Sequence, residues 1–243
     1  ILKDGFSKNW MNVEPREGKS RANYNAGEAY DVHPYILLNF TNDYGSVSTF
    51  AHEWGHAVHT TLAKKDNSYE TFSAPTYTAE LASTTNEVML QEYMSSKEAS
   101  NDKEQLFYIE NAINKIHSSF FRPAMYGEFE MNLHQVIEAG GDLTGNKISA
   151  MYLLLLKKYY GHELGIMNID DLYGIEWAAN TQFFYRTFYI YKYATSLTGA
   201  INFVERMLDG DKYASPDFIK LLKAGASQHP YDLLKNSGVN FNI

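Results

Sequence analysis

The sequence predicts a mainly α-helical protein with a small β element placed directly before its first long helix. Long stretches of helix-compatible sequence are separated by Gly- and Asn-containing breaks, such as "EAGGDLTGN" at residues 138–146. The apolar run "PYILLNF" at residues 34–40 is consistent with a buried strand. Of the 243 residues, 44% are hydrophobic and 21% charged, close to the averages of folded globular domains.

The expected elements follow from breaks and caps along the chain. The strand ends at the turn-like "TNDYG", and Ser46 or Ser48 is expected to cap the next helix, which runs to Lys65 before "KKDNS" breaks it. Further helices are expected over 77–97, 103–138, 147–160, 183–208, 216–224 and 230–236. No boundary in the sequence divides the chain, so residues 1–243 are expected to form one domain.

Composition excludes several classes of partner. The net charge of −8 and the absence of long basic runs argue against nucleic acid, which calls for clustered Lys and Arg. No apolar stretch approaches the roughly 18 residues of a membrane span. The chain has no Cys, which rules out disulfides and thiolate metal ligands. It is therefore compatible with a reducing compartment, and we expect a cytoplasmic location. Nothing in the sequence indicates an oligomeric state.

The strongest motif is His-Glu-Trp-Gly-His at residues 52–56. Positions i and i+4 of a helix share one face, with Cβ atoms about 5–6 Å apart. His52 and His56 can therefore reach one zinc ion at about 2.0–2.1 Å. Glu53 lies beside that face, where it can activate a metal-bound water without displacing it. The alternative, two histidines satisfied by other partners, is the weaker interpretation of this spacing.

Glycine at position 55 also needs a reason. Gly inside a helix costs about 1 kcal/mol relative to Ala. Close approach of another backbone near the metal would compensate for that cost, so Gly55 predicts such an approach.

A catalytic zinc ion needs a third protein ligand and one open position. A later His or an acid on a neighbouring helix could supply it. Glu80 and Glu87 are seven residues apart in "TAELASTTNE", hence on one face of one helix, and a return helix would bring that face against the first. Either could be a solvated surface acid, but the need for a ligand favours a functional role for at least one. Glu80 is the better candidate.

At this point several motifs together resemble a known family. The chain is similar to the catalytic domain of oligoendopeptidase F, in the thimet oligopeptidase family of zinc metallopeptidases. The resemblance rests on "YDVHPYILLNF", "AHEWGHAVH" and "TAELASTTNE", and further on "DDLYGIEWA", "FYRTFYIYKYATS" and "PYDLLKNSGV". It implies a zincin-like helical catalytic domain that lacks the family's N-terminal helical lobe and its last C-terminal helix.

The resemblance assigns roles to the residues of these motifs. It implies one Zn²⁺ held by His52, His56 and Glu80, with Glu53 as the general base. Glu87 is implied to orient a metal ligand.

The aromatic segment near residue 190 resembles the family's tyrosine segment, whose hydroxyls face the scissile carbonyl. Tyr191 is the best match, with Tyr189 and Tyr185 as further candidates. The family has a Pro-His pair before the "FY" of this segment, whereas this chain has Gln182 and Phe183. Phenylalanine donates no hydrogen bond, so this departure predicts weaker transition-state stabilisation or an altered substrate preference.

The function expected from these residues is zinc-dependent hydrolysis of internal bonds in short peptides. Two alternatives stay open: a zinc carboxypeptidase of the same architecture, and an inactive zinc-containing domain that binds peptides. The edge of the strand at 34–40 is expected to pair with an extended substrate, with His33 and Tyr35 as candidate substrate contacts.

Overall fold

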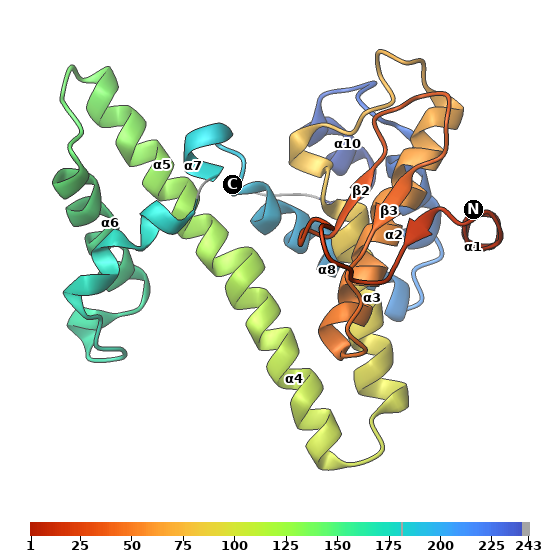
Figure 1. Cartoon of the computed structure of the whole chain (residues 1–243), viewed down its shortest axis with the longest axis horizontal. Coiled ribbons are helices and arrows are strands. Elements are labelled where there is room, and N and C mark those ends of the chain that lie inside the picture. Colours follow the sequence, from red (N-terminus) through yellow and green to blue (C-terminus); the bar gives the residue numbers. More distant parts are fainter. Residues whose placement is uncertain (181, 240–243) are drawn as a thin grey trace. The chain divides into compact units, whose positions relative to one another are not determined.

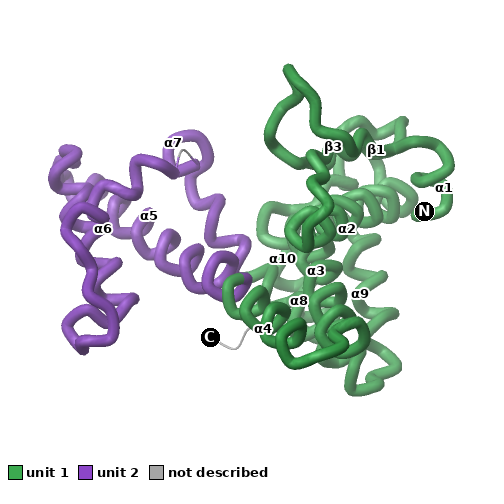
Figure 2. The backbone as a smooth tube through the Cα atoms, turned by 60° about the horizontal axis from the view of Figure 1, so that its bottom comes forward, with its two compact units in different colours: residues 1–114, 195–243 green, residues 115–194 purple. Residues whose placement is uncertain are grey.

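The computed structural model describes residues 1–180 and 182–239 and is mainly α-helical, as the sequence predicts (Figure 1). The chain falls into two compact units, residues 1–114 with 195–243 and residues 115–194 (Figure 2). The boundaries between them lie within α4 (Asp102–Ile116) and α8 (Lys192–Leu208). The assignment of residues 1–243 to one catalytic domain stays a prediction.

A three-stranded sheet lies in the first unit. Its strands are β1 (Met11–Asn12), β2 (Tyr24–Ala26) and β3 (Tyr35–Leu37), in the order β1-β3-β2. β3 is parallel to β1 and antiparallel to β2. The strand predicted at 34–40 is therefore confirmed over Tyr35–Leu37, and it is the central strand of the sheet.

The long helix α2 (Tyr44–Asp66) follows the sheet directly and carries the His-Glu-Trp-Gly-His motif. Its N-cap is Asp43, whose side chain accepts a hydrogen bond from the Ser46 N–H at 2.7 Å. The prediction of Ser46 or Ser48 as the cap is therefore wrong. Asp43 has the extended backbone that a capping residue requires, whereas both serines lie inside the helix.

The next helix, α3 (Leu81–Tyr93), packs against α2, as expected of a return helix. The Asn86 side chain ties the two together by donating to the Ala51 carbonyl at 3.0 Å. A 3₁₀ turn at Thr76–Thr78 comes first, so α3 begins later than the predicted residue 77. Glu80 consequently occupies the N-cap position and not the helix interior.

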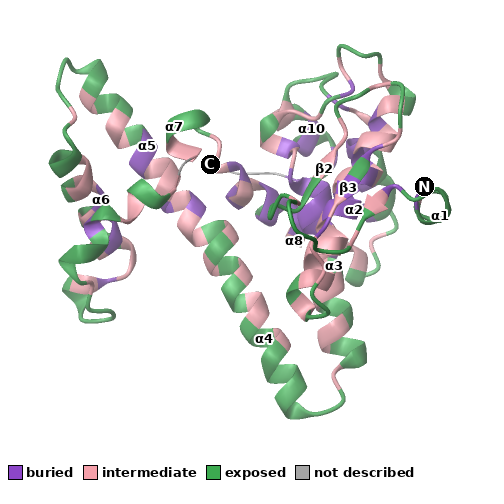
Figure 3. Ribbon diagram, in the orientation of Figure 1, coloured by how far each residue is buried: buried purple, intermediate pink, exposed green. Residues whose placement is uncertain are grey.

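Two buried clusters hold α2 and α3 in place within the first unit. One packs the sheet against α2 and contains Trp10, Ile36, Leu38, Trp54 and Ala57. The other packs α3 among α8, α9 (Ala214–Lys223) and α10 (Pro230–Asn236) through Leu81, Phe203, Phe218 and Leu234. Helix α2, which carries the metal motif, is thus held in place by its packing against the sheet and α3. Figure 3 shows the buried residues of this region in purple.

The remaining elements of the first unit are peripheral. They are α1 (Leu2–Ser7), the π-helical turn Met94–Glu98 and the part of α4 up to residue 114. No residue of α4 is buried, and its ribbon is green and pink along its length in Figure 3. Among the described residues, no helix is long and apolar enough to cross a membrane.

The second unit is built on two helices, α5 (Arg122–Glu138) and α6 (Gly145–Tyr159). Its other elements are the π-helical turn His117–Phe121, the 3₁₀ helices His162–Leu164 and Asp171–Ala179, and α7 (Gln182–Tyr185). Its buried core consists of Met125, Phe129, Tyr152, Leu155 and Leu156. Phe183 packs at the edge of this core, 5.3 Å from Tyr126 and 5.4 Å from Phe129 between ring centroids.

The predicted helix at 183–208 is interrupted. α7 ends at Tyr185 and α8 begins at Lys192, with turns between them. Phe188 in this interval has φ +49°, a left-handed conformation that a right-handed helix cannot contain. The interval is rich in aromatic and β-branched residues, which lose rotamer freedom in a helix and favour it weakly.

Candidate metal centre

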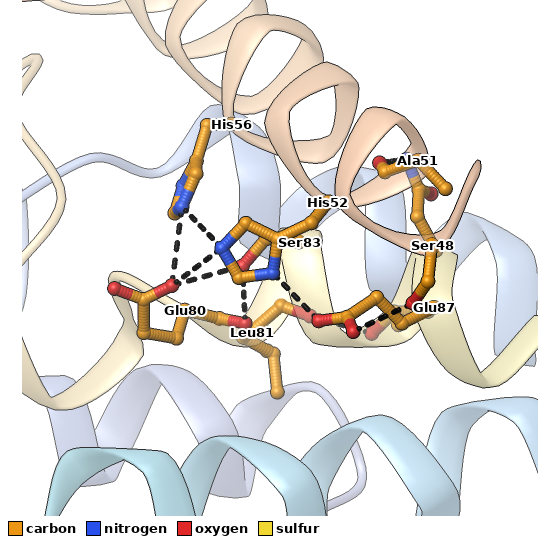
Figure 4. Close-up of polar contacts among 10 residues, drawn as sticks. Ser48, Ala51, His52, His56, Glu80, Leu81, Ser83 and Glu87 are labelled. Atoms are coloured by element: carbon orange, nitrogen blue, oxygen red, sulfur yellow. Dashed lines mark hydrogen bonds and ion pairs between the residues drawn. The ribbon is translucent and has the colours of Figure 1, made fainter. Parts of the chain in front are cut away.

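Three side chains meet where α2 faces the start of α3 (Figure 4). Nε2 of His52 lies 3.2 Å from Nε2 of His56. Oε2 of Glu80 lies 3.3 Å from His52 Nε2 and 3.1 Å from His56 Nε2. Within residues 1–180 and 182–239, this is the one group of His and acidic side chains placed so that three of them could hold a metal ion.

The dimensions of this triangle fit a zinc ion. Bonds of about 2.0–2.1 Å to the corners of a tetrahedron place neighbouring ligand atoms roughly 3.3 Å apart. The three measured separations, 3.1–3.3 Å, are close to that value. Two imidazole nitrogens and one carboxylate oxygen are also a donor set that zinc prefers, and three protein ligands leave a fourth corner for solvent or substrate.

Gly55 explains how α3 comes close enough. A Cβ atom at this position would lie 2.5 Å from the Ser83 Cα and 2.7 Å from the Ala82 carbonyl oxygen. Only a glycine permits this contact between the backbones of α2 and α3. The close approach expected from the sequence is therefore confirmed. Gly55 lies between the two histidines in the chain, and the backbone that it meets follows closely after Glu80.

Glu87 contacts the far side of the His52 ring. Its Oε1 lies 2.6 Å from Nδ1 of His52, and its Oε2 accepts a hydrogen bond from Ser48 Oγ at 3.1 Å. When His52 Nδ1 carries the proton, Nε2 is left as a lone-pair donor that points into the triangle. Ser48 was missed as a site residue, although it lies four residues before His52 and so shares its helix face.

Ser83 fixes Glu80 in a similar way. Its hydroxyl lies 3.1 Å from Glu80 Oε2 and 2.9 Å from the Glu80 carbonyl oxygen. Ser83 too was not predicted as a site residue, although a serine three positions after an N-cap acid faces that acid across the first turn.

The electrostatics of the triangle favour a positive charge. Burial lowers the pKa of His52, but its hydrogen bonds to Glu80 and Glu87 outweigh burial and raise this pKa to about 9. The side chain of Glu80 is only 8% exposed, so its carboxylate is poorly solvated and needs a compensating cation.

Glu53 lies next to His52 on α2 and is 5% exposed. Its Oε2 is buried and accepts no hydrogen bond within the described part of the chain. Burial raises the pKa of Glu53, while the imidazoles of His52 and His56 oppose that rise. A buried carboxylate oxygen that has no protein donor is suited to accept a proton from a solvent or substrate molecule.

The three tyrosines of the aromatic segment lie in the unit of residues 115–194, whereas the metal-site side chains belong to the other unit. Tyr185 ends α7 and is 81% exposed. Two cations lie over the ring of Tyr189, with Lys192 Nζ at 3.7 Å and the Arg186 guanidinium carbon at 4.8 Å from its centroid. Tyr191 lies in the turn before α8. Their role toward substrate stays a prediction.

The predicted pairing of a substrate with the strand at 34–40 is wrong. Ile36 is paired with Met11 on one side and with Asn25 on the other. Both edges of β3 are therefore already occupied, because β1 and β2 flank it. His33 stacks on Trp10 at 4.9 Å and lies 4.4 Å from Tyr35 between ring centroids, and their contact with substrate stays a prediction.

The motifs that indicated oligoendopeptidase F have counterparts in known proteins. The chain is 36% identical to oligopeptidase PepF of Bacillus subtilis, over 99% of this chain and 35% of that protein. It is 32% identical to the chromosomal oligoendopeptidase F of Lactococcus lactis subsp. cremoris, over 98% of this chain and 39% of that protein. The chain thus spans little more than a third of the length of these curated relatives.

Solved structures agree with the sequence relatives. A crystal structure of a protein from Chlamydophila abortus is 35% identical, with a TM-score of 0.82 over 98% of this chain and 39% of that one. The oligoendopeptidase-F of Enterococcus faecium is 29% identical, with a TM-score of 0.66 over 81% of this chain and 34% of that one. The resemblance to oligoendopeptidase F is confirmed. The sequence model of peptidase family M3 matches residues 1–242, and the chain therefore belongs to this family.

Proposed function

We propose that the chain carries the catalytic centre of a zinc-dependent oligoendopeptidase, which cuts internal bonds of short peptides in the cytoplasm. The observation that carries this proposal is the triangle of His52, His56 and Glu80 with the buried Glu53 carboxylate beside it. Two relatives are named oligoendopeptidase F and oligopeptidase PepF, which supports peptides as the substrate class.

Each side chain around the triangle has a role in this proposal. His52, His56 and Glu80 would hold one zinc ion. Glu87 keeps the proton of His52 on Nδ1, and Ser83 fixes the carboxylate of Glu80. When bound, zinc supplies a Lewis acid that polarises a peptide carbonyl and acidifies a water molecule.

Glu53 performs the proton transfers. Its unbonded oxygen takes a proton from the attacking water as the general base. The same carboxyl group then gives that proton to the departing amine, so that the enzyme returns to its starting protonation state. Burial supports both steps because it raises the pKa of the Glu53 carboxyl group, which brings it closer to the pKa values of the groups that give and take the proton.

A tyrosine hydroxyl completes the proposed site by donating to the developing oxyanion. Tyr191 is the first candidate, followed by Tyr189 and Tyr185. One such donor is worth about 100- to 1,000-fold in kcat. His33 and Tyr35 are candidate contacts for the substrate, and Tyr35 is 52% exposed.

The test uses internally quenched peptides with both termini blocked, incubated with the zinc-loaded chain. The parent is expected to cut them, and a chelator abolishes cleavage. Glu53→Gln is expected to keep stoichiometric zinc and lose activity, because an amide cannot accept the proton. Glu92→Gln, which changes an exposed acid of α3, serves as the matched control.

The outcomes separate the proposal from its alternatives. A carboxypeptidase leaves blocked peptides intact and cuts those with a free C-terminus. A peptide-binding domain without activity binds stoichiometric zinc and cuts neither kind. Cleavage by Glu53→Gln at the rate of the parent contradicts the assignment of the general base.

A further inference from the structure

The turn around Phe188 has a backbone conformation that its sequence does not favour. Phe188 has φ +49°, and among L-residues mainly Asn and Asp tolerate positive φ. This turn separates Tyr185 from Tyr189 and Tyr191. Its backbone conformation therefore determines the positions from which the Tyr189 and Tyr191 side chains extend. Interactions outside the turn must therefore hold it in place.

Those interactions come from one face of α5. The Phe188 N–H donates to Glu130 Oε1 at 2.9 Å, and the Phe188 ring stacks on His134 at 4.9 Å. One turn before Glu130, a Cβ at Gly127 would lie 3.2 Å from the Cβ of Tyr191. Three residues of α5, Gly127, Glu130 and His134, thus lie against the turn at Phe188 and at Tyr191.

A carboxylate is a costly choice for this contact. Glu130 is 4% exposed, and its Oε2 is buried with no hydrogen-bond partner in the described part of the chain. Burial raises the pKa of Glu130, and the Phe188 N–H and His134 oppose that rise. A group needed only for packing would avoid this desolvation, whereas a hydrogen bond to a charged acceptor is stronger than a neutral one.

We propose that Glu130 is a positioning residue, whose carboxylate holds the Phe188 N–H in the left-handed turn and so sets the placement of Tyr189 and Tyr191. This inference rests on the proposed function, in which a tyrosine of this segment stabilises the oxyanion. Displacement of a reacting group by about 1 Å can cost on the order of 100-fold in rate. Loss of the hydrogen bond between the Phe188 N–H and Glu130 is therefore expected to lower kcat.

The activity test compares two substitutions at Glu130 in the full chain. Glu130→Gln keeps an oxygen acceptor, although a neutral and weaker one, and is expected to lower kcat less than a variant without an acceptor does. Glu130→Met removes the acceptor at similar size and is expected to lower kcat by about 10- to 100-fold, with KM and zinc content unchanged. Glu128→Met is the control: this acid of the same helix contacts Lys158 and Tyr159 instead of the turn, so kcat is expected to stay that of the parent.

A second measurement does not depend on peptidase activity. The Phe188 amide hydrogen is expected to exchange slowly in the parent and in Glu130→Gln, and faster in Glu130→Met. Equal exchange in the parent and in Glu130→Met overturns the inference, as does faster exchange with an unchanged kcat. If the zinc-loaded parent cuts no peptide, the proposed function fails, while the exchange data still decide whether Glu130 holds the turn.

Two substitutions at position 188 carry the test if Glu130→Met does not fold. Phe188→Gly keeps the N–H and tolerates positive φ, so the turn and kcat are expected to persist. Phe188→Val places a β-branched residue where positive φ is strongly disfavoured and is expected to lower kcat as Glu130→Met does. Equal kcat in these two variants contradicts the inference.

Discussion

Nδ1 of His52 lies 2.6 Å from Oε1 of Glu87, while Nε2 of the same ring lies 3.3 Å from Oε2 of Glu80. The segment that starts α3 therefore touches both nitrogens of one α2 histidine. Glu80 can bind the same metal ion as this ring, and Glu87 fixes the tautomer and the rotation of the ring. The relative position of α2 and α3 thus determines the geometry of the whole centre.

Glu87→Gln is expected to weaken zinc binding by about 10- to 100-fold, because a neutral amide oxygen stabilises the proton on His52 Nδ1 less than a carboxylate does. Competition between the protein and a chelator of known affinity measures this change. Glu92→Gln, an exposed acid of the same helix, is expected to bind zinc as the parent does. Equal zinc affinity in both variants would show that Glu87 does not contribute to zinc binding.

Gly55→Ala is expected to push α3 away from α2, because the new Cβ meets backbone atoms at 2.5–2.7 Å. Overpacking of this kind costs about 1–3 kcal/mol of unfolding free energy, which urea titration measures. Zinc affinity is expected to fall as well, since Glu80 moves with α3. Gly145→Ala, at the start of α6 with no atom near its Cβ, is the contrasting control and gains about 0.4–1 kcal/mol.

His59 is expected to make the protein less stable in acid. Burial lowers its pKa to about 4, with a smaller contribution from His56, whereas the unfolded value is about 6.5. Between these two pKa values the unfolded chain binds more protons than the folded protein. The contribution of His59 to stability is therefore fully present above pH 6.5. It is lost as pH falls, at about 1.4 kcal/mol per pH unit until pH 4.

Urea unfolding at pH 7 and pH 5, with a chelator present throughout, measures this effect. The glutamine side chain of the His59→Gln variant does not titrate. Between pH 7 and pH 5, the unfolding free energy of this variant is therefore expected to fall by about 2 kcal/mol less than that of the parent. The chelator removes the separate pH dependence of metal binding. Parallel losses in the two proteins would show that His59 is not the group responsible.

Tyr191→Phe is expected to lower kcat by about 100- to 1,000-fold with zinc content unchanged, because it removes one hydroxyl donor to the oxyanion. Tyr189→Phe and Tyr185→Phe are expected to have smaller effects. Tyr213→Phe, at an exposed tyrosine preceding α9, is the control. If all four variants match the parent, the donor lies outside this segment.

Much of the centre could be predicted from the sequence because its information is local. The spacing of His52 and His56 places both rings on one helix face, and Gly55 indicates the close approach of a second backbone. The contributions of Ser48 and Ser83 depend on where α2 and α3 touch, which spacing alone does not determine.

The errors in the fold arose where distant or weak signals decide the structure. β1 and β2 have two and three residues, too few for a recognisable alternation, so the central position of β3 could not be anticipated. At the interruption, the Phe188 N–H donates a hydrogen bond to Glu130, 58 residues earlier in the chain, and the local sequence does not reveal so distant a partner.

All three candidate metal donors come from residues 52–80, a continuous stretch formed by α2, a short connection and the N-cap of α3. The entropic cost of closing a loop increases with the number of residues between its ends. A cation bound here would therefore join two segments that are neighbours in the chain, and all three of its protein ligands would come from them. The loop that such a cation would close is consequently short, and closing it would cost less entropy than joining ligands from opposite ends of the chain.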